Sequence, residues 1–337
     1  MGNSIVRVTR GGITESQHEI AVAVVSSDGR LLARVGDVHL ATFARSSAKP
    51  IQAIPLVESG AADYFHFDEA DVALSCASHS SELQHTNRVS NLLERIGLDE
   101  TYLQCGPHIP HSMETYDRVL LAGQKLSSLY SNCSGKHTGM LAYAQFTKSD
   151  PKTYHRLEHP LQQEVLGLVS ELTEVDREKI AIGTDGCGVP AFGLPIENWA
   201  LGFAKFADPA NRPHGEAMAR ISAAMRAFPE LVGGTDRFDT DLMKVTQGRL
   251  LAKGGAEGFM AVVVPEAKLA ISMKVVDGNS RAIPPSIIKT LWEMNLITTD
   301  EMSELAKYEH PSLTNTRNEE VGEIIPDFQL DKVEFRG

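Results

Sequence analysis

Short strand-like segments lie at both ends of this chain, and a long helical region separates them. Residues 5–8, 19–25 and 30–35 are rich in aliphatic side chains, and Ser26-Ser-Asp-Gly29 is a hairpin turn signal. Residues 258–264 and 269–275 form a second hairpin pattern, whereas residues 60–230 carry apolar side chains mostly at helical spacing. We therefore predict an α+β fold with one antiparallel sheet, formed by the N- and C-terminal strands and flanked by helices.

The bulk composition is that of an ordinary globular protein. The 337 residues show no internal repeat, low-complexity tract or flexible linker, which predicts a single catalytic domain over residues 1–337, in one piece or two lobes. A net charge of −12 argues against nucleic acid as a partner, and no apolar run reaches the length of a membrane span. Four cysteines are too few for a disulfide scaffold, and no secretory signal is evident. We expect a cytoplasmic protein.

The stretch Arg45-Ser-Ser-Ala-Lys-Pro50 joins the strand-like region to an apolar pattern at helical spacing. Residues three apart share one face of a helix, so Ser46 and Lys49 would lie together. A serine nucleophile can pass its proton to an amine, provided that the amine is uncharged. A free lysine has a pKa of about 10.4, so burial and a second nearby cation would be needed to lower it. The alternative interpretation is a helix N-cap followed by a solvated lysine.

Two further stretches supply partners for such a pair. In LSCASHSSE, residues 74–82, Ser78 is a second hydroxyl that could relay a proton to a leaving amine. The alternative is that Ser80 or Ser81 caps the next helix. In residues 250–264, Lys253 precedes Gly254-Gly255 at the start of a strand-like segment and provides the second cation. The glycines would let a substrate lie against the backbone.

Two cysteine-containing segments, residues 131–141 and 182–195, are expected to be loops because glycines and charged residues surround each cysteine. Cys133, Lys136, His137, Asp185 and Cys187 would gather around a ligand or a metal ion. Two thiolates make a soft half-site for zinc, although no Cys-x-x-Cys spacing is present. The alternative for His137 is a capping or hydrogen-bonding role within its loop.

Six motifs occur in order along the chain: Arg45-Ser-Ser-Ala-Lys-Pro50, Cys76-Ala-Ser-His-Ser80, Asn132-Cys-Ser-Gly-Lys-His137, Gly183-Thr-Asp-Gly-Cys-Gly188, Lys253-Gly-Gly-Ala-Glu-Gly258 and Val276-Asp-Gly278. Together they resemble the inducible, thermolabile bacterial L-asparaginase family typified by the Rhizobium enzymes. Leu313-Thr-Asn-Thr-Arg317 and Val321-Gly-Glu-Ile324 also fit, so the resemblance covers nearly the whole chain. One residue departs from the pattern: Ser81 stands where a glycine is expected, which would stiffen that loop.

This resemblance implies a fold like that of serine β-lactamases and penicillin-binding proteins, a homodimer, and hydrolysis of L-asparagine to L-aspartate and ammonia. It implies two Ser-Lys pairs, Ser46 with Lys49 and Ser78 with Lys253. It also implies a metal site, with zinc expected, and a set of substrate or metal-shell contacts. The implied metal ligands are Cys133, Lys136 and Cys187, and the implied contacts are Arg45, Glu82, His137 and Asp185.

The predicted reaction is acyl transfer, in which neutral Lys49 takes the proton of Ser46 as the hydroxyl attacks the side-chain amide. Ammonia would leave after protonation through Ser78, with Lys253 polarising that serine, and the two serines could exchange roles. Arg45 suits the α-carboxylate of asparagine, and Glu82 or Asp185 suits its α-ammonium group. The alternatives are a serine hydrolase of the same fold acting on β-lactams or peptides, and a non-catalytic sensor that binds an amino acid or a metal.

Overall fold

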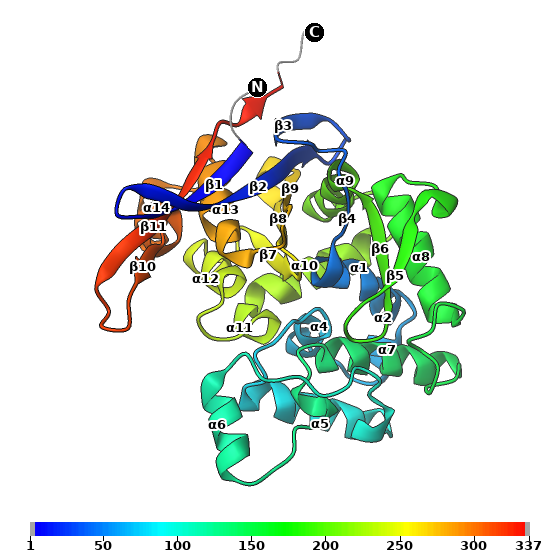
Figure 1. The fold of residues 1–337 in the computed structure, drawn as a ribbon. Coiled ribbons are helices and arrows are strands. Elements are labelled where there is room, and N and C mark those ends of the chain that lie inside the picture. The colour runs from blue at the N-terminus through cyan, green and yellow to red at the C-terminus, as the bar shows by residue number, and fades with distance from the viewer. Residues whose placement is uncertain (1–3, 334–337) are drawn as a thin grey trace. The chain divides into compact units, whose positions relative to one another are not determined.

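The computed structural model describes residues 4–333, and the chain divides into two compact units. The first unit is formed by Met1–Ser47, Leu194–Asp208 and Asp241–Gly337, and the second by Ala48–Gly193 and Pro209–Thr240. Strands from both ends of the chain dominate the first unit, and helices dominate the second (Figure 1).

The first unit is built on one sheet, in which nine strands pair within residues 4–333. They are β1 (Ser4–Arg10), β2 (Ile13–Ser26), β3 (Leu31–Val35), β7 (Leu251–Gly255), β8 (Phe259–Val264), β9 (Leu269–Val275), β10 (Ser312–Thr314), β11 (Glu320–Phe328) and β12 (Asp331–Lys332). The path runs β10–β11–β1–β2–β9–β8–β7, with β3 paired to β2 and β12. Neighbouring strands are antiparallel, including β1 with β11 and β2 with β9. The predicted α+β fold, with one antiparallel sheet from both ends of the chain, is confirmed.

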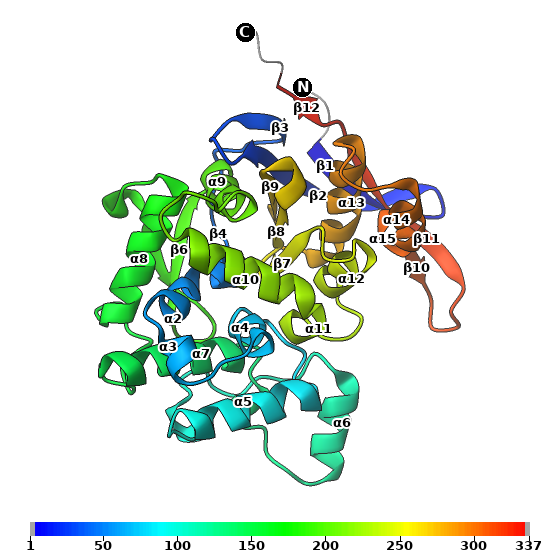
Figure 2. The same ribbon diagram turned by 180° about the vertical axis from the view of Figure 1, so that it is seen from behind.

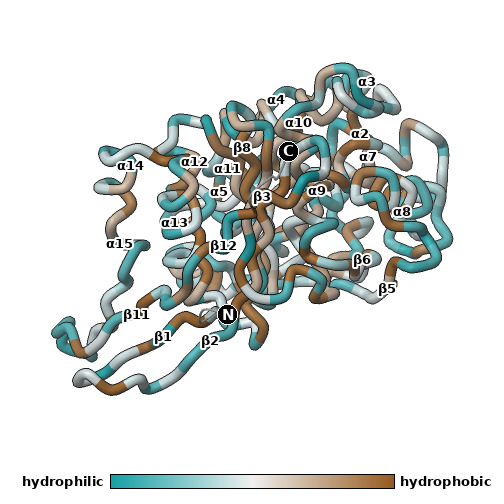
Figure 3. The backbone as a smooth tube through the Cα atoms, turned by 90° about the horizontal axis from the view of Figure 1, so that it is seen from above, coloured by the Kyte–Doolittle hydropathy of each residue, from teal (hydrophilic) through white to brown (hydrophobic). Residues whose placement is uncertain are grey.

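Strand β2 lies in the middle of this sheet because its second half is apolar on both faces. Every residue from Ile20 to Ser26 is buried, and the strand pairs with β9 over the same stretch. Helix α9 (Ile196–Ala207) packs on β2, β8 and β9, and its residues Ile196 and Ala200 join Ala23 and Val25 in one apolar cluster. In Figure 3 the tube at the label β8 is brown, in agreement with the apolar sequence of this strand.

The other elements of the first unit surround this core. Helix α13 (Ile283–Glu293) packs against β9 and β11 and contacts α15 (Ala306–Glu309). The unit also contains β4 (Ala41–Phe43) and α14 (Thr299–Glu304), and α12 (Phe238–Val245) crosses the boundary between the units.

The second unit is mainly helical. Its helices are α1 (Lys49–Gln52), α2 (Ile54–Glu58), α3 (Ala61–Tyr64), α4 (Glu69–Ser75), α5 (Leu83–Arg95), α6 (Met113–Leu121), α7 (Ser134–Thr147), α8 (Pro160–Thr173), α10 (Gly215–Ala227) and α11 (Pro229–Val232). Strand β5 (Ala181–Thr184) pairs antiparallel with β6 (Pro190–Pro195). These helices lie largely within residues 60–230, where the apolar pattern predicted mostly helix.

Helix α4 is the centre of the second unit, with α5, α7, α10 and α11 packed around it (Figure 2). Its contact with α7 is close at two glycines of α7, one against the backbone of α4 and the other against a side chain. A Cβ atom on Gly135 would lie 2.4 Å from the Leu74 carbonyl oxygen, and one on Gly139 would lie 2.9 Å from Ser75 Oγ. Larger residues at these two positions would force the helices apart.

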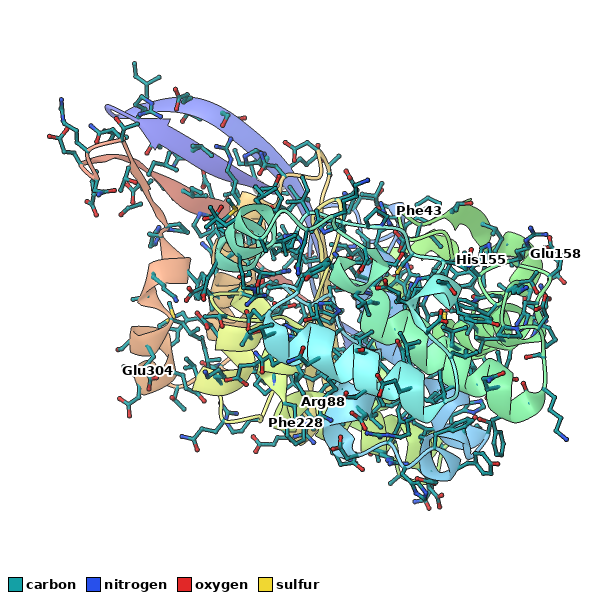
Figure 4. The ribbon with its side chains drawn as sticks, turned by 90° about the horizontal axis from the view of Figure 1, so that it is seen from below. Phe43, Arg88, His155, Glu158, Phe228 and Glu304 are labelled. Atoms are coloured by element: carbon teal, nitrogen blue, oxygen red, sulfur yellow. The ribbon has the colours of Figure 1, made fainter. Side chains whose placement is uncertain are left out.

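A buried carboxylate fixes α4 to α5. The Asp71 side chain is fully buried and forms ion pairs with Arg88, which Figure 4 labels, and with Arg95 at 2.9 Å. Both arginines are on α5, so one charge holds two positions of that helix. Removing either partner of such a buried pair would leave a charge without compensation.

Three segments differ from the sequence-based predictions. The helical pattern after residue 48 is split at Ala53 into α1 and α2, because Pro55 has no N–H to continue the first helix. Residues 131–141, predicted as a loop, instead begin helix α7 at Ser134. Residues 182–195, also predicted as a loop, instead hold most of β5 and all of β6, with a turn between the two strands. None of the helices in the described part of the chain is long and apolar enough to cross a lipid bilayer.

Candidate active site

Arg45 and Ser46 lie where the chain leaves β4 and enters a short 3₁₀ helix, Arg45–Ala48. Arg45 has φ 51°, in the left-handed region that a branched or long side chain rarely adopts. Backbone conformations of this kind concentrate at functional sites. Here the strained residue directly precedes the serine predicted to be the nucleophile.

Ser46 and Ser47 differ in what their hydroxyls can do. Ser47 is fully buried, and its hydroxyl donates to the Lys253 carbonyl oxygen at 2.7 Å. Ser46 is half-buried, so it is the more accessible of the two serines.

Lys253 lies on β7 beside the segment that precedes Ser46. Its side chain is fully buried, and Nζ donates to the Gly254 carbonyl oxygen at 2.7 Å. A Cβ atom on Gly255 would lie 2.4 Å from the Ala44 carbonyl oxygen and 3.0 Å from Ser47 Oγ. Gly255 therefore lets the chain's own segment at Ala44–Ser47 approach β7, whereas the sequence suggested a role in admitting substrate.

In the second unit, Lys49 contacts Ser78. Lys49 Nζ lies 2.9 Å from Ser78 Oγ and also donates to the Ala77 carbonyl oxygen. Only 1% of the Lys49 surface is exposed, and 5% of that of Ser78. The contact therefore sits where solvent screening is weak. The predicted pairs, Ser46 with Lys49 and Ser78 with Lys253, each join residues of different units and stay predictions.

The other serines around Ser78 have structural roles. Ser75, Ser80 and Ser81 donate to the carbonyl oxygens of Asp71, Gly233 and Tyr130 at 2.9, 3.0 and 2.7 Å. The suggestion that Ser80 or Ser81 caps the next helix is wrong, because the N-cap of α5 is Glu82. Within the run from Ser75 to Ser81, Ser78 is thus the serine whose hydroxyl meets an amine.

His79 and Ser81 hold the loop of residues 76–82 in place. His79 is fully buried, with Nδ1 accepting from the Ser81 N–H at 3.2 Å and Nε2 lying 2.9 Å from Ser134 Oγ. Burial, followed by the neighbouring His85 ring, holds the pKa of His79 well below its usual value. Ser81 has φ 63°, a left-handed conformation. This explains why a glycine was expected there: the loop needs a conformation that glycine adopts without strain.

The cysteine cluster was predicted from two separate segments, and the structure brings them together. Cys133 is the N-cap of α7, Lys136 lies in its first turn, and Cys187 lies in the turn between β5 and β6. All three side chains are buried, and Lys136 Nζ lies 3.0 Å from Cys187 Sγ.

Charge is distributed unevenly over this cluster. A hydrogen bond from Cys133, with a contribution from the charge of Lys136, holds the pKa of Cys187 well below its usual value. The same hydrogen bond, together with burial, raises the pKa of Cys133 to about 12. Burial alone would lower the pKa of Lys136, but the two sulfurs outweigh it and raise that pKa. The directions of these shifts favour loss of the proton from Cys187 before Cys133.

These donors fit a zinc ion chemically. Among the described residues, no group of three or more histidine, cysteine, aspartate or glutamate side chains is arranged to hold a metal. The predicted ligand set adds the amine of Lys136 to the two sulfurs and stays a prediction. Sulfur and nitrogen are donors that zinc accepts, and the lowered pKa of Cys187 favours the deprotonated form that metal binding requires.

The remaining predicted contacts lie at two places in the second unit. Glu82 accepts from the Thr235 N–H and from Gln84 Nε2, both at 2.7 Å. It lines a groove of about 610 Å³ whose wall also includes Ser80 and Arg237. Asp185 lies in the β5–β6 turn, where Oδ1 accepts from the Gly186 N–H at 2.7 Å. Its charge acts on Lys136, so Asp185 lies near the cysteine cluster.

His137 has a partner that sequence analysis missed. His137 Nδ1 lies 2.6 Å from the hydroxyl oxygen of Tyr154, and the Gln104 N–H donates to the same oxygen at 2.9 Å. Burial, followed by the charge of Lys136, holds the pKa of His137 well below its usual value. A lone tyrosine in the polar stretch between α7 and α8 gave no signal of this contact in the sequence.

Comparison with known proteins assigns the chain to a class and then to a family. It is an amidohydrolase, with a helix-flanked antiparallel sheet and a buried serine–lysine contact. A family model described as L-asparaginase II matches residues 6–326, so the chain belongs to that family. The resemblance noted from the motifs is thereby confirmed.

Similar solved structures are distant from this chain. One is a Bacillus subtilis glutaminase, YbgJ, in covalent complex with 5-oxo-L-norleucine, with a TM-score of 0.40, 15% identity, and coverage of 86% of this chain and 91% of that chain. Another is a beta-lactamase from Mycobacterium bovis, with a TM-score of 0.37, 17% identity, and coverage of 86% and 95%. Comparison with curated protein sequences finds no match.

Proposed function

We propose that this chain is an asparaginase that hydrolyses L-asparagine to L-aspartate and ammonia through a serine nucleophile activated by lysine. Membership of the L-asparaginase II family supports the reaction. The observation that carries the mechanism is the 2.9 Å contact between Lys49 Nζ and Ser78 Oγ in buried surroundings.

The proposed reaction has two halves. In the first, Ser46 Oγ forms a bond to the side-chain amide carbon while Lys49 takes the serine proton. Lys49 then passes a proton through Ser78 to the amide nitrogen, the C–N bond breaks and ammonia leaves. In the second half, water attacks the acyl-enzyme, its proton returns by the same relay, and aspartate is released. Lys253 supplies a fixed positive charge that favours the uncharged form of a neighbouring amine.

Substrate recognition needs opposite charges for the two ends of the amino acid. We assign Arg45 to the α-carboxylate, because a guanidinium group binds a carboxylate through two parallel hydrogen bonds. Glu82 or Asp185 is assigned to the α-ammonium group, and His137 to an oxygen of the substrate. Asparagine differs from glutamine by one methylene, so discrimination between them depends on how closely these charges are spaced.

Zinc is proposed as the metal, held by Cys133, Lys136 and Cys187. When bound there it would supply a fixed positive charge and brace the start of α7 against the β5–β6 turn. Lys136 would bind it as a free amine, so metal binding would release a proton.

We also propose a cytoplasmic homodimer. The four cysteines, Cys76, Cys105, Cys133 and Cys187, are all free and buried, which suits a reducing compartment. Light scattering on purified protein tests the dimer.

An ammonia-release assay with L-asparagine and L-glutamine tests the activity. Ser46→Ala should lower kcat by on the order of 10³-fold or more, because the bond-forming oxygen is lost. Ser75→Ala is the matched control: it removes a hydroxyl that donates to a backbone carbonyl, and the rate should stay near that of the wild type. Full activity in Ser46→Ala would refute the nucleophile assignment.

The two rival functions give different results in the same experiment. A hydrolase of β-lactams or peptides would open a chromogenic cephalosporin and release no ammonia from asparagine. A non-catalytic sensor would bind an amino acid or zinc without turnover, and Ser46→Ala would leave that affinity intact. Ammonia release without cephalosporin hydrolysis supports the asparaginase.

A further inference from the structure

The loop between α7 and α8 places one tyrosine hydroxyl deep in the second unit. Tyr154 is 0% exposed, and the next residue, His155, is labelled in Figure 4. The Tyr154 oxygen has two hydrogen-bond partners, the backbone N–H of Gln104 at 2.9 Å and Nδ1 of His137 at 2.6 Å. The mechanism proposed above gives Tyr154 no role.

The directions of these two hydrogen bonds follow from the groups involved. A backbone N–H can only donate, so the Tyr154 oxygen accepts from Gln104. A buried phenol O–H also needs an acceptor, and Nδ1 of His137 is the acceptor that the described residues place within reach, so we assign the lone pair to this nitrogen. A neutral imidazole with a bare Nδ1 carries its proton on Nε2. Tyr154 therefore determines which nitrogen of His137 is the donor.

The other nitrogen of His137 is left without a protein partner. His137 is 0% exposed, and its Nε2 atom is buried with no hydrogen-bond partner within residues 4–333. Buried donors are rarely left unpaired in folded proteins. An N–H fixed in this way is suited to an oxygen that arrives with a ligand.

We propose that Tyr154 is a positioning residue, which locks His137 in the tautomer with its proton on Nε2 so that this N–H donates to an oxygen of the bound amino-acid amide. This inference rests on the proposed function for the identity of the ligand. A ring nitrogen that carries a proton has no lone pair for a metal, so the lock also keeps His137 Nε2 from acting as a metal ligand.

The tautomer can be measured directly by nitrogen NMR on protein labelled with ¹⁵N-histidine. The chain has 12 histidines, and the signals of His137 are those that disappear in His137→Gln. In the wild type we expect a protonated Nε2 and a bare Nδ1. A proton on Nδ1 in the wild type would overturn the proposal without the need for any further variant.

Tyr154→Phe removes the hydroxyl and keeps the ring. We expect the His137 signals to shift toward a mixture of tautomers and kcat/KM for asparagine to fall on the order of tenfold, the value of one hydrogen bond. Tyr143→Phe is the matched control, because it removes a phenol hydroxyl that donates to Glu164 instead of to His137. An unchanged tautomer in Tyr154→Phe would overturn the proposal, and so would the same shift in Tyr143→Phe.

A double-variant cycle separates positioning from general damage to the fold. Glutamine at residue 137 offers an amide N–H near the position of Nε2 and has no tautomer to select. Tyr154→Phe should therefore change kcat/KM little in the His137→Gln background. A full tenfold loss of kcat/KM in that background would refute the proposal that Tyr154 selects the tautomer of His137. If the wild type releases no ammonia, the proposed function fails, while the NMR result still decides the tautomer.

Discussion

Lys49 and Ser78 are 29 residues apart in the chain, and their side chains meet at 2.9 Å between Nζ and Oγ. Lys49 Nζ has a second acceptor in the carbonyl oxygen of Ala77, the residue before Ser78. The loop that carries Ser78 is itself anchored, with the Ser78 N–H donating to the Val232 carbonyl oxygen at 2.9 Å. The amine is therefore held at a fixed place beside the hydroxyl, as proton transfer requires.

Lys49→Met should remove the proton acceptor while keeping a side chain of similar length. We expect kcat for ammonia release to fall on the order of 10²- to 10⁴-fold, the usual contribution of a general base. We expect kcat of Ser78→Ala to fall by a factor in the same range. Steady-state kinetics measure both, and circular dichroism checks that each variant is folded. Near-wild-type turnover in both variants would rule out the relay.

Zinc binding should depend on Cys133 and Cys187 and be independent of Cys76. We expect one zinc per chain after dialysis against the metal, and loss of that zinc in Cys133→Ala and Cys187→Ala. Cys76→Ala is the control, because Cys76 is a buried cysteine that ends α4. At zinc about 100-fold above its dissociation constant, binding should stabilise the fold by about 2.7 kcal/mol.

The thermal unfolding midpoint provides a second measure of that metal. Adding a chelator to the zinc-loaded wild type should lower Tm, whereas the chelator should leave Tm of Cys187→Ala unchanged. Retention of zinc by Cys187→Ala would refute the assigned ligand set.

Ser81→Gly should be more stable than Ser81→Ala. Both variants lose the hydrogen bond to the Tyr130 carbonyl oxygen, but only alanine keeps a Cβ atom at the left-handed φ of 63°. We expect a difference in unfolding free energy of about 1 kcal/mol in favour of glycine. Urea denaturation measures it, and equal stabilities would mean that the loop relaxes out of this conformation.

His214 should stabilise the protein more at low pH than at high pH. Partial burial alone would lower the pKa of His214, but its hydrogen bonds to Glu58 at 2.8 Å and Glu171 at 3.3 Å outweigh burial and raise it. A group with a raised folded-state pKa contributes fully below its unfolded value, about 6.5, and loses this contribution as the pH rises through the folded value.

His214→Asn is the variant for this test, because asparagine tolerates the left-handed φ of 62° at this residue. Its destabilisation should be larger at about pH 5.5 than at about pH 8.5, by about 0.5 kcal/mol for a partly exposed ion pair. Denaturation curves at the two pH values measure the difference. A larger loss at the higher pH would contradict the sign.

The central strands of the sheet could be predicted from sequence because their residues are apolar on both faces. The hairpin from Phe259 to Val275 is such a case, and its predicted limits match the observed ones closely. Strands β10 to β12 gave no comparable signal, since most of their residues are at least partly exposed. They are defined by pairing with β11, β1 and β3, which no local pattern reveals.

Helix α7 was predicted as a loop because its first turns contain Gly135 and Gly139. Glycines in a polar stretch usually indicate a turn, but here they permit a close contact with α4. Among the site residues, too, some contacts could be predicted from the sequence and others could not. Motif order identified the cysteine cluster, whereas the contact of Tyr154 with His137 depends on how two distant segments pack.

The close contact at Gly135 has one more consequence. Helix α4 leads directly into the loop of Ser78, and the first turn of α7 carries Lys136 and His137. With no side chain between the two backbones at that point, neither helix can slide or rotate without carrying the other. Because Gly135 has no methyl group, the loop that carries Ser78 and the cysteine cluster move together as one rigid body. A Gly135→Ala substitution would disturb both at once.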